Sequence, residues 1–472
     1  MPMEGRSAVM PSKCEPNPPS AHLVGICGAG MKALAELLDG YGWRLSGSDL
    51  QPANSSIESL ALHGMKFFQG HAASNVPPEA QCLIYSPAVL TTNPERQEAA
   101  RRGIPSWSYS QMIGELMKPR TGICIAGTHG KSTTTAMVGW ILSVAGRDPA
   151  VLVGAELCDS GQSGRAGRSD LLVAESCEFN HSFLDFQPKH AAILNVETDH
   201  FDYYADLASM IEAFRQFSDR VPGDGVLVVN GDSAATMQAV QEASARRVTF
   251  GTQSSSDWCG EHLVDDTAGV RFSVVSRGKS WGQINLQLHG RHNAQNALAA
   301  AALCAEVGVS REDIISALRS FGGIRRRFET IGERNGVVLI GDYAHHPTAV
   351  RATLETARQV YGSRKIWCVF QPHQVSRTTA LMNDFVASFS DADEVLILPV
   401  FAAREQVTDE PIRVSQELAR RITSTGRAAR FVESLDQIMT TVDDAARPGD
   451  VLIAMGAGDI DRINHEFTRS VC

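Results

Sequence analysis

Short runs of consecutive apolar residues recur along the chain, and most are followed by a longer stretch with helical composition. From residue 22 the sequence runs HLVGIC, a glycine-rich turn, MKALAELLDGYG and then RLSGSD. Continuous apolar runs are typical of parallel strands that are covered on both faces. The order strand, helix, strand predicts a βαβ unit, so the chain opens with an α/β arrangement.

The same alternation continues through the rest of the chain. The middle part has strand-like runs at 122–126, 171–174, 191–196, 226–229, 270–275 and 284–288, and helical stretches at 133–144 and 293–308. The last part alternates VVLIGDY, KIWCVFQ, EVLILPV, RFV and DVLIAMG with helical stretches. This regular order predicts mainly parallel sheets with helices on both faces.

The length of 472 residues is sufficient for about three domains. The pattern breaks at Lys118–Arg120 and again at the basic stretch GGIRRRFE, residues 322–329. We therefore expect a disordered Pro- and Ser-rich tail over 1–20 and three domains over 21–119, 120–326 and 327–472.

Composition narrows the possible partners and the compartment. A net charge of −10 and a pI near 5.8 argue against a nucleic-acid-binding surface. The ten cysteines are scattered singly, which indicates reduced thiols and a cytoplasmic protein. No stretch is long and apolar enough to predict a membrane span, and the first twenty residues lack the apolar segment of a signal peptide.

The segment GTHGKSTTT, Gly127–Thr135, lies between a predicted strand and a predicted helix. Gly127 and Gly130 allow the backbone N–H groups to face an anion, and the helix N-terminus adds a partial positive charge. Lys131 can reach terminal phosphates, and the Ser132 hydroxyl can bind Mg²⁺. An ordinary glycine-rich turn is the alternative. Ile125 replaces the first glycine of the full P-loop pattern, so we predict ATP binding but not a generic P-loop ATPase.

Acidic residues and a histidine follow two apolar runs of the middle part. Glu175 follows the run at 171–174, and Glu197, Asp199, His200 and Asp202 follow the run at 191–196. Ligands of open α/β sheets lie beyond the carboxyl ends of the strands, so these side chains are candidate ligands for Mg²⁺ or Mn²⁺. The alternative for Asp199 and Asp202 is that they cap the next helix.

Two histidine-containing loops follow strands of the last part. They are DYAHHP, 342–347, and QPHQVSR, 371–377. Arg377 matches a carboxylate with a bidentate fork, and a histidine can orient or deprotonate an amine near neutral pH. We infer an anionic, amino-acid-like substrate, although surface histidine pairs are common and spacing alone leaves both interpretations open.

The first glycine-rich turn, GICGAGM, is a weaker motif. Turns of this kind bind dinucleotides or other diphosphates, and Asp49 would then lie near a ribose. No separate feature of the sequence requires NAD.

Several motifs occur in the order found in the Mur ligases. These are GTHGKSTTT, NVETDHFDYY, GRHNAQNALAA, GGIRRRFE, DYAHHPTAV, FQPHQVSRT and GAGDI. The chain resembles that family from about His22 to its C-terminus, and within it the branch that adds L-alanine. The resemblance implies a Rossmann-like UDP-substrate domain, a P-loop-like ATPase domain and a Rossmann-like amino-acid domain. It implies ATP-dependent joining of L-alanine to the carboxylate of UDP-N-acetylmuramate through an acyl phosphate, for peptidoglycan precursor synthesis, by a monomer or weak homodimer.

The resemblance also assigns roles to individual positions. It places the UDP-sugar at Gly28, Ala29, Gly30, Met31, Asp49 and Ser86. It places ATP at Gly127, Thr128, His129, Gly130, Lys131, Ser132, Thr133, His292, Asn293, Asn296 and Arg327. It places the amino acid at Tyr343, His345, His346, His373 and Arg377. It places Mg²⁺ or Mn²⁺ at Ser132, Glu175 and His200, and it implies that Lys131, His200, Arg327 and His345 are catalytic.

Two positions depart from the family pattern. Gln374 stands where the alanine-adding branch usually has an arginine, which removes one cation from the expected carboxylate site. The central acidic motif reads AESCEFN, which keeps Glu175 in register and places a second acid at Glu178. The competing hypotheses are a murein-peptide ligase, an NAD-dependent oxidoreductase built on the first βαβ unit, and a non-catalytic nucleotide-binding regulator.

Overall fold

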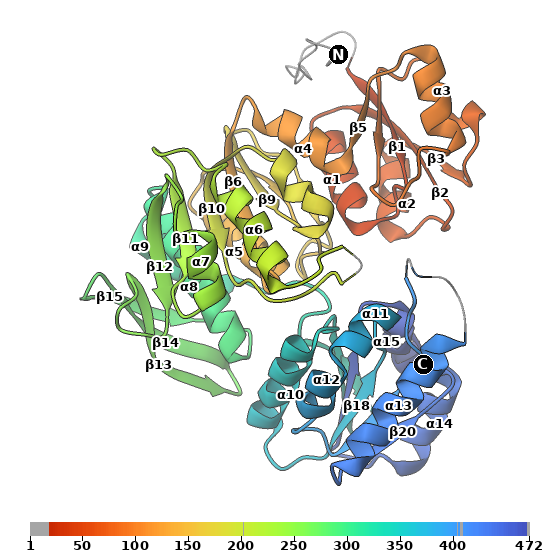
Figure 1. Cartoon of the computed structure of the whole chain (residues 1–472), viewed down its shortest axis with the longest axis vertical. Helices are drawn as coiled ribbons and strands as arrows, with labels where there is room; N and C mark the ends of the chain where they lie inside the picture. The colour runs from red at the N-terminus through yellow and green to blue at the C-terminus, as the bar shows by residue number, and fades with distance from the viewer. Residues whose placement is uncertain (1–17, 202, 404, 406–408, 470–472) are drawn as a thin grey trace.

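The computed structural model describes residues 18–201, 203–403, 405 and 409–469. Residues 1–17, which hold most of the expected tail, and Asp202 lie outside the described residues. Ser20, which the sequence assigned to the tail, is instead the first residue of the first strand, where its backbone pairs in register with Arg44. The described part of the chain forms three α/β units, each built around its own sheet (Figure 1). The predicted α/β class is confirmed.

The first unit is a five-stranded parallel sheet in the order β3-β2-β1-β4-β5. Its strands are β1 (Ser20–Val24), β2 (Arg44–Asp49), β3 (Lys66–Gln69), β4 (Cys82–Tyr85) and β5 (Ser106–Ser108). Its helices are α1 (Ala29–Gly40), α2 (Ser55–Leu62), η1 (Ala73–Asn75), α3 (Pro94–Arg102) and α4 (Tyr109–Met117). The reversal of strand order beside β1 creates the crevice in which doubly wound sheets bind ligands.

The central unit is a ten-stranded sheet in the order β15-β14-β13-β12-β11-β10-β6-β9-β7-β8. Its strands are β6 (Thr121–Ala126), β7 (Ala150–Leu152), β8 (Gly164–Arg165), β9 (Leu171–Glu175), β10 (Pro188–Ile193), β11 (Val226–Asn230), β12 (Arg246–Gly251), β13 (Trp258–Asp266), β14 (Gly269–Ser276) and β15 (Lys279–Asn285). Its helices are α5 (Lys131–Val144), η2 (Phe179–Asp185), α6 (Leu207–Ser218), α7 (Ala234–Ala239), α8 (Arg291–Glu306) and α9 (Arg311–Ser320).

One edge of the central sheet differs from the sequence prediction. Strand β13 was not predicted, and β15 begins at Lys279 rather than at Ile284. β13 and β15 pair antiparallel with β14, and exposed and half-buried residues make up most of both. Strands of this kind lack the long apolar runs by which the buried parallel strands are recognised.

The third unit is a six-stranded sheet in the order β16-β17-β21-β18-β19-β20. Its strands are β16 (Glu329–Arg334), β17 (Val337–Asp342), β18 (Ile366–Phe370), β19 (Glu394–Ile397), β20 (Ala428–Phe431) and β21 (Val451–Met455). Its helices are α10 (Pro347–Tyr361), α11 (Val375–Ala380), α12 (Met382–Ser388), α13 (Glu410–Ser424), α14 (Leu435–Ala445), η3 (Asp459–Asp461) and α15 (Arg462–Arg469). Only β16 pairs antiparallel among these strands, so the sheet is mainly parallel as predicted.

The first and central units pack closely together. One hydrophobic core runs from Leu23 in β1 to Ile193 in β10 without a break between the units. Glu36 of α1 accepts hydrogen bonds from the backbone N–H groups of Ser163 and Gly164, at 2.8 and 2.7 Å. A Cβ at Gly164 would lie 1.8 Å from the Ala33 carbonyl oxygen, so only glycine permits this approach of β8 to α1.

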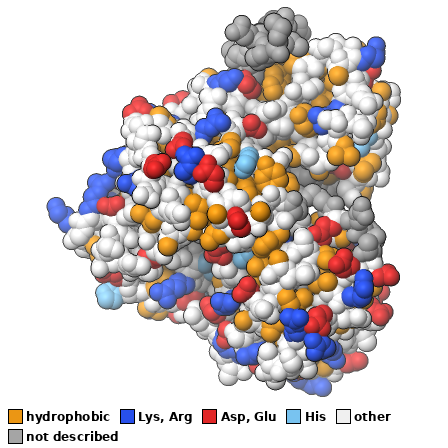
Figure 2. Space-filling model, viewed as in Figure 1, with side chains coloured by type: hydrophobic (Ala, Val, Ile, Leu, Met, Phe, Trp, Pro, Cys, Tyr) orange, Lys and Arg blue, Asp and Glu red, His pale blue; other side chains and the backbone are white. Residues whose placement is uncertain are grey.

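The third unit has its own cores on the two faces of its sheet and meets the central unit through polar contacts. In Figure 1 it forms the lower, blue part of the molecule, opposite the red first unit. Acidic and basic side chains are interspersed over the face shown in Figure 2. No helix among the described residues is long and apolar enough to cross a membrane.

Candidate functional site

A cavity of about 930 Å³ lies where the three units meet. Its walls come from the start of α1, from the loops that follow β6, β9 and β10, from the start of α8, from the segment that leads into β16, and from the loop after β17. The predicted ATP-site residues that line it are Thr128, His129, Gly130, Lys131, Ser132, Thr133, His292, Asn293, Asn296 and Arg327. Gly127 precedes this set, and its carbonyl oxygen accepts a hydrogen bond from Lys131.

The turn between β6 and α5, the predicted phosphate loop, has a tightly constrained conformation. Gly130 has a φ of +81°, and a Cβ on it would lie 2.4 Å from Oδ1 of Asn296, so this position requires glycine. Asn195, after β10, accepts a hydrogen bond from the His129 backbone N–H at 2.7 Å and donates one to the His129 carbonyl. The loop is therefore held in place by α8 and by the end of β10, with the α5 N-terminus facing the cavity.

The Lys131 side chain lies against an acid that the sequence gave no role. Its Nζ atom is 3.0 and 2.9 Å from the two carboxylate oxygens of Glu178, whose side chain is fully buried. Burial alone would lower the pKa of Lys131, but the surrounding acidic groups, chiefly Glu178 with its charge and hydrogen bonds, together outweigh burial and raise that pKa. Burial likewise would raise the pKa of Glu178, but Lys131 and His200 lower it. Both groups are therefore charged at neutral pH.

The predicted metal ligands lie close to this pair. Ser132 and Glu175 line the cavity, and Glu175 accepts a hydrogen bond from the Gly154 backbone N–H at 2.6 Å. His200 lies with Nε2 3.4 Å from a Glu178 oxygen, and its Nδ1 is buried without a hydrogen-bond partner in the described part of the chain. His200 also has a left-handed φ of 54°, a strained conformation for a residue with a side chain.

This donor set suits a hard divalent cation. The cavity lining contains two carboxylates, Glu175 and Glu178, with the Ser132 hydroxyl and the His200 imidazole, and oxygen atoms predominate among these donors, as Mg²⁺ prefers. Glu178 is the additional candidate, and AESCEFN already contained its signal as the second acid of the motif. Asp202, another acid considered from the sequence, is not among the described residues.

The start of α8 forms another wall of the cavity. Asn293 donates a hydrogen bond to the His289 carbonyl at 2.7 Å, and Asn296 donates one to Oδ1 of Asn293 at 3.2 Å. Burial and the nearby Arg327 charge lower the pKa of His292 to about 4, so its imidazole is neutral near pH 7. Three of the predicted ATP-site residues thus occupy one helical turn.

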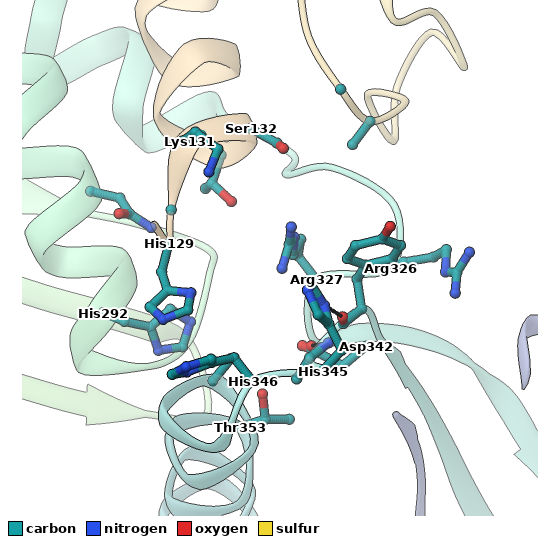
Figure 3. A pocket seen from close by; sticks show the side chains of 18 of the residues that line it. His129, Lys131, Ser132, His292, Arg326, Arg327, Asp342, His345, His346 and Thr353 are labelled. Atoms are coloured by element: carbon teal, nitrogen blue, oxygen red, sulfur yellow. Dashed lines mark hydrogen bonds between the residues drawn. The ribbon is translucent and has the colours of Figure 1, made fainter. Parts of the chain in front are cut away.

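Arg327 reaches the cavity from the segment that joins the central and third units. Its guanidinium lies 5.2 Å from the centre of the Tyr343 ring, and Asp342 holds the segment by accepting a hydrogen bond from the Phe328 backbone N–H. Asp342 also accepts the Ala344 N–H at 2.7 Å, which fixes the loop after β17. Figure 3 shows Arg327 above Asp342 and His345, across the cavity from Lys131. Sequence reasoning did not single out Asp342.

Two histidines, His345 and His346, follow β17, and the first has a defined hydrogen bond. His345 is close to Tyr343, whose carbonyl oxygen is 2.9 Å from His345 Nδ1. Because a carbonyl only accepts, Nδ1 carries the proton and Nε2 keeps a lone pair. Burial and the Arg377 charge hold the pKa of His345 well below its usual range. Tyr343, His345 and His346 all line the cavity.

His373 and Arg377, the other predicted amino-acid ligands, are outside the cavity lining. The Arg377 guanidinium contacts one Asp199 oxygen with Nε at 2.8 Å and Nη2 at 2.7 Å, and both side chains are buried. Its Nη1 donates to His373 Nδ1 and to the His373 carbonyl. Asp199 thus binds an arginine of the third unit. It also accepts a hydrogen bond from the His200 backbone N–H.

The predicted UDP-sugar residues gather at the crevice of the first sheet. Asp49, at the end of β2, accepts a hydrogen bond from the Cys27 backbone N–H at 2.8 Å beside the Gly28 N-cap of α1. Ser86 follows β4, and its backbone N–H donates to the Val24 carbonyl. Ala29 lines the cavity, whereas the Met31 side chain is buried in the core and offers only its backbone to a ligand. Gly30 lies between them in the first turn of α1.

Models of three Mur ligase domains match this chain. The Mur ligase family catalytic domain matches residues 20–121, the Mur ligase middle domain 125–304, and the Mur ligase glutamate ligase domain 326–458. The UDP-N-acetylmuramate–L-alanine ligase of Alkaliphilus metalliredigens is 38% identical over 93% of this chain and 95% of its own length. The chain belongs to the Mur ligase family. The resemblance predicted from the motifs is confirmed.

Three further comparisons agree with this assignment. The UDP-N-acetylmuramate–L-alanine ligase of Nitratidesulfovibrio vulgaris (strain DP4) is 40% identical over 94% of this chain and 97% of its own length. The crystal structure of the UDP-N-acetylmuramate-alanine ligase of Thermotoga maritima superposes with a TM-score of 0.81 at 27% identity, covering 96% of this chain and 99% of that one. A murein peptide ligase from Psychrobacter arcticus shares the fold, with a TM-score of 0.72 at 24% identity and coverage of 96% and 98%.

Proposed function

We propose that this Mur ligase joins L-alanine to the carboxylate of UDP-N-acetylmuramate with hydrolysis of ATP to ADP and phosphate. The observation that carries the proposal is the phosphate loop of Gly130 and Lys131, which faces a cavity shared by all three units. The relatives named as alanine ligases match nearly the whole chain, which supports the same activity here.

We assign one substrate to each unit. The first unit, residues 21–119, would hold the UDP part at Asp49, Ser86 and the start of α1. The central unit, 120–326, would hold ATP, and the third, 327–472, would hold L-alanine. Strand β6 begins at Thr121 and β16 at Glu329, which supports these boundaries.

The first chemical step in this proposal is phosphoryl transfer. A carboxylate oxygen of the sugar attacks the γ-phosphorus, the bond to the β-phosphate oxygen breaks, and ADP leaves. Lys131 and Arg327, on opposite walls, would neutralise charge on the transferring group. Lys131 must exchange part of its contact with Glu178 for phosphate oxygens.

A divalent cation would lie beside Ser132, Glu175 and His200, with Glu178 as a fourth candidate. When bound, the ion supplies positive charge to the phosphate oxygens. The buried Nδ1 atom of half-buried His200 has no hydrogen-bond partner among the described residues, which supports this placement because such an atom is costly to leave unpaired.

The second step is attack of the alanine amine on the acyl carbon, with release of phosphate. The amine must first lose a proton, and His345 offers a neutral Nε2 at the cavity wall. We propose His345 as the base, with Tyr343 and His346 beside it. Arg377 would bind the alanine carboxylate only by sharing its guanidinium between that group and Asp199.

The test measures ADP release with ATP, UDP-N-acetylmuramate and a panel of amino acids. Turnover that needs both the sugar and L-alanine supports the proposal, and turnover without the sugar contradicts it. A second arm replaces L-alanine with the tripeptide that a murein peptide ligase would use. Preference for the tripeptide would reassign the acceptor while leaving the ATP site unchanged.

A further inference from the structure

A second group of metal-ligating side chains lies beside the phosphate loop, separate from the proposed magnesium site. His129, Glu197 and His346 each place one ligand atom within 4.8 Å of the others. His129 Nε2 is 3.4 Å from a Glu197 oxygen, and the His129 and His346 ring centroids are 4.7 Å apart. Figure 3 shows the His129 and His346 rings on the same side of the cavity.

Neighbouring residues hold the three side chains in place by hydrogen bonds, as commonly occurs around the ligands of a bound metal ion. Glu197 accepts a hydrogen bond from the Thr348 hydroxyl at 2.8 Å, which fixes the carboxylate. His346 Nε2 lies 3.3 Å from the Thr198 carbonyl oxygen, the type of partner that a ligating imidazole commonly has. Its Nδ1 would then bind the ion in place of the long hydrogen bond, 3.4 Å, that it accepts from the Thr348 backbone N–H. His129 Nε2 is buried and makes no hydrogen bond to any described residue. A buried ring nitrogen without such a bond is a position that a cation can satisfy.

The chemistry of the donors selects the class of ion. Two imidazoles and one carboxylate are the ligand set of Zn²⁺ sites that keep a fourth position open. First-row transition metals bind imidazole more strongly than Mg²⁺ does, since Mg²⁺ prefers all-oxygen sites. His129 and His346 line the cavity, so the fourth ligand would be water or an anionic oxygen from within it.

We propose that His129, Glu197 and His346 form a transition-metal site, with Zn²⁺ as the fitting ion, that links the central unit to the third. His129 and Glu197 come from the loops after β6 and β10, whereas His346 is the N-cap residue of α10. Because the site is complete only when the two units are in contact, bound metal stabilises their contact. This site is distinct from the one at Ser132, Glu175 and His200, and its existence does not depend on the ligase reaction.

The experiment titrates metal-stripped full-length protein with Co²⁺, a visible-absorbing substitute for Zn²⁺, without ATP, sugar or amino acid. The wild type should show the absorption of a four-coordinate Co²⁺ complex, and Zn²⁺ should displace it while equimolar Mg²⁺ does not. Displacement by equimolar Mg²⁺ would place the ion at the other site and overturn the proposal.

Three variants locate the bound ion. Glu197→Gln and His346→Asn should each weaken Co²⁺ binding by at least about tenfold. Loss of a residue that only hydrogen-bonds to a metal ligand commonly lowers metal affinity by that factor, and loss of the ligand itself should lower it at least as much. Thr348→Val, which leaves all three ligands in place, should weaken it less. The matched control is His63→Asn, which removes an exposed histidine paired with Asp39 in the first unit and should change nothing. Equal Co²⁺ affinity in wild type and in folded Glu197→Gln and His346→Asn would overturn the site.

Thermal unfolding supplies a readout besides affinity. Zn²⁺ should raise the unfolding midpoint of the wild type and of His63→Asn, but not that of Glu197→Gln. Midpoints measured without metal show whether each variant folds, and Thr348→Val remains informative if a ligand variant does not. A Zn²⁺-dependent rise of equal size in Glu197→Gln would contradict the proposed site.

Discussion

Arg377 and Asp199 form a buried ion pair between residues 178 positions apart in sequence, and the pair joins the third unit to the central unit. From the sequence, Arg377 was predicted to bind the alanine carboxylate. In the structure its guanidinium already donates hydrogen bonds to Asp199 and His373. Burial would raise the pKa of Asp199, but the Arg377 charge holds it well below the usual range. In the proposed alanine site, the cation that would bind the amino-acid carboxylate is therefore the one that also joins the two units.

Arg377→Ala is expected to raise the KM for L-alanine by at least about tenfold, since an unpaired carboxylate costs about 2–5 kcal/mol. The KM values for ATP and the UDP-sugar should change little. The variant should also unfold at a lower temperature, because Asp199 stays buried without its partner. Asp199→Asn is the control, because it breaks the same pair and keeps the guanidinium. An unchanged alanine KM in Arg377→Ala, with lowered stability in both variants, would restrict Arg377 to holding the units together.

Lys131→Ala should abolish detectable ADP release, because the loss of a phosphate-clamping charge removes several kcal/mol of transition-state stabilisation. The structure adds an effect on stability, since Glu178 is left buried and charged. Breaking such a pair costs about 3–5 kcal/mol. The double variant Lys131→Ala, Glu178→Gln should recover most of the thermal midpoint without recovering turnover. Near-normal turnover in the single variant would contradict the assignment of the ATP site.

Glu175→Ala and His200→Ala should both raise the Mg²⁺ concentration needed for half-maximal activity. Glu178→Gln tests the additional candidate and should act in the same direction if that carboxylate binds the ion. The measurement is a Mg²⁺ titration of ADP release at saturating ATP. Identical titrations in wild type, Glu175→Ala and His200→Ala would mean that these groups stabilise the loops without binding metal.

Stability should fall as the pH is lowered from about 6.5 toward 4. Burial and the neighbouring His129 charge lower the pKa of His346 to about 4 in the folded chain, against an ordinary value of 6.5. Between these pH values the histidine is protonated in the unfolded chain but not in the folded chain. Each such histidine therefore lowers the free energy of unfolding by up to about 1.4 kcal/mol for each pH unit of acidification. Above pH 6.5 the contribution is complete and constant.

The check is the thermal midpoint measured across this pH range for wild type and His346→Asn, which keeps a side chain able to cap α10. The variant should show the shallower pH dependence. His292, with its pKa also lowered to about 4, should account for part of the dependence that remains. A variant with the same slope as the wild type would show that His346 is protonated alike in both states.

Much of the fold followed from the sequence because buried parallel strands carry continuous apolar runs. The helix predicted from Thr133 to Val144 is α5, which starts two residues earlier, at Lys131, because Gly130 caps it. The turn itself was predictable, since a Gly-Lys-Ser turn between a strand and a helix commonly binds nucleotide phosphates. The edge strand β13, largely exposed or half-buried, has no such signature.

The pairs that define the site were beyond sequence reasoning for a different reason. Lys131 contacts Glu178, and Arg377 contacts Asp199, only because separate loops end at the same point in space. Neither spacing nor residue type shows which of several acids a cation selects. Asp342 was overlooked because its role is to accept two backbone N–H groups, which leaves no pattern in the sequence.

Gly164 has a consequence for the geometry of catalysis. The approach of β8 to α1 at this glycine sets how far the start of α1 lies from the phosphate loop, because Glu36 and the shared core hold both elements. In the proposed arrangement of the substrates, this contact would fix the distance between the diphosphate of the UDP-sugar and the γ-phosphate of ATP. We expect a side chain at position 164 to push α1 away from β8 and so to separate the two proposed sites, although every residue assigned to either substrate would be intact.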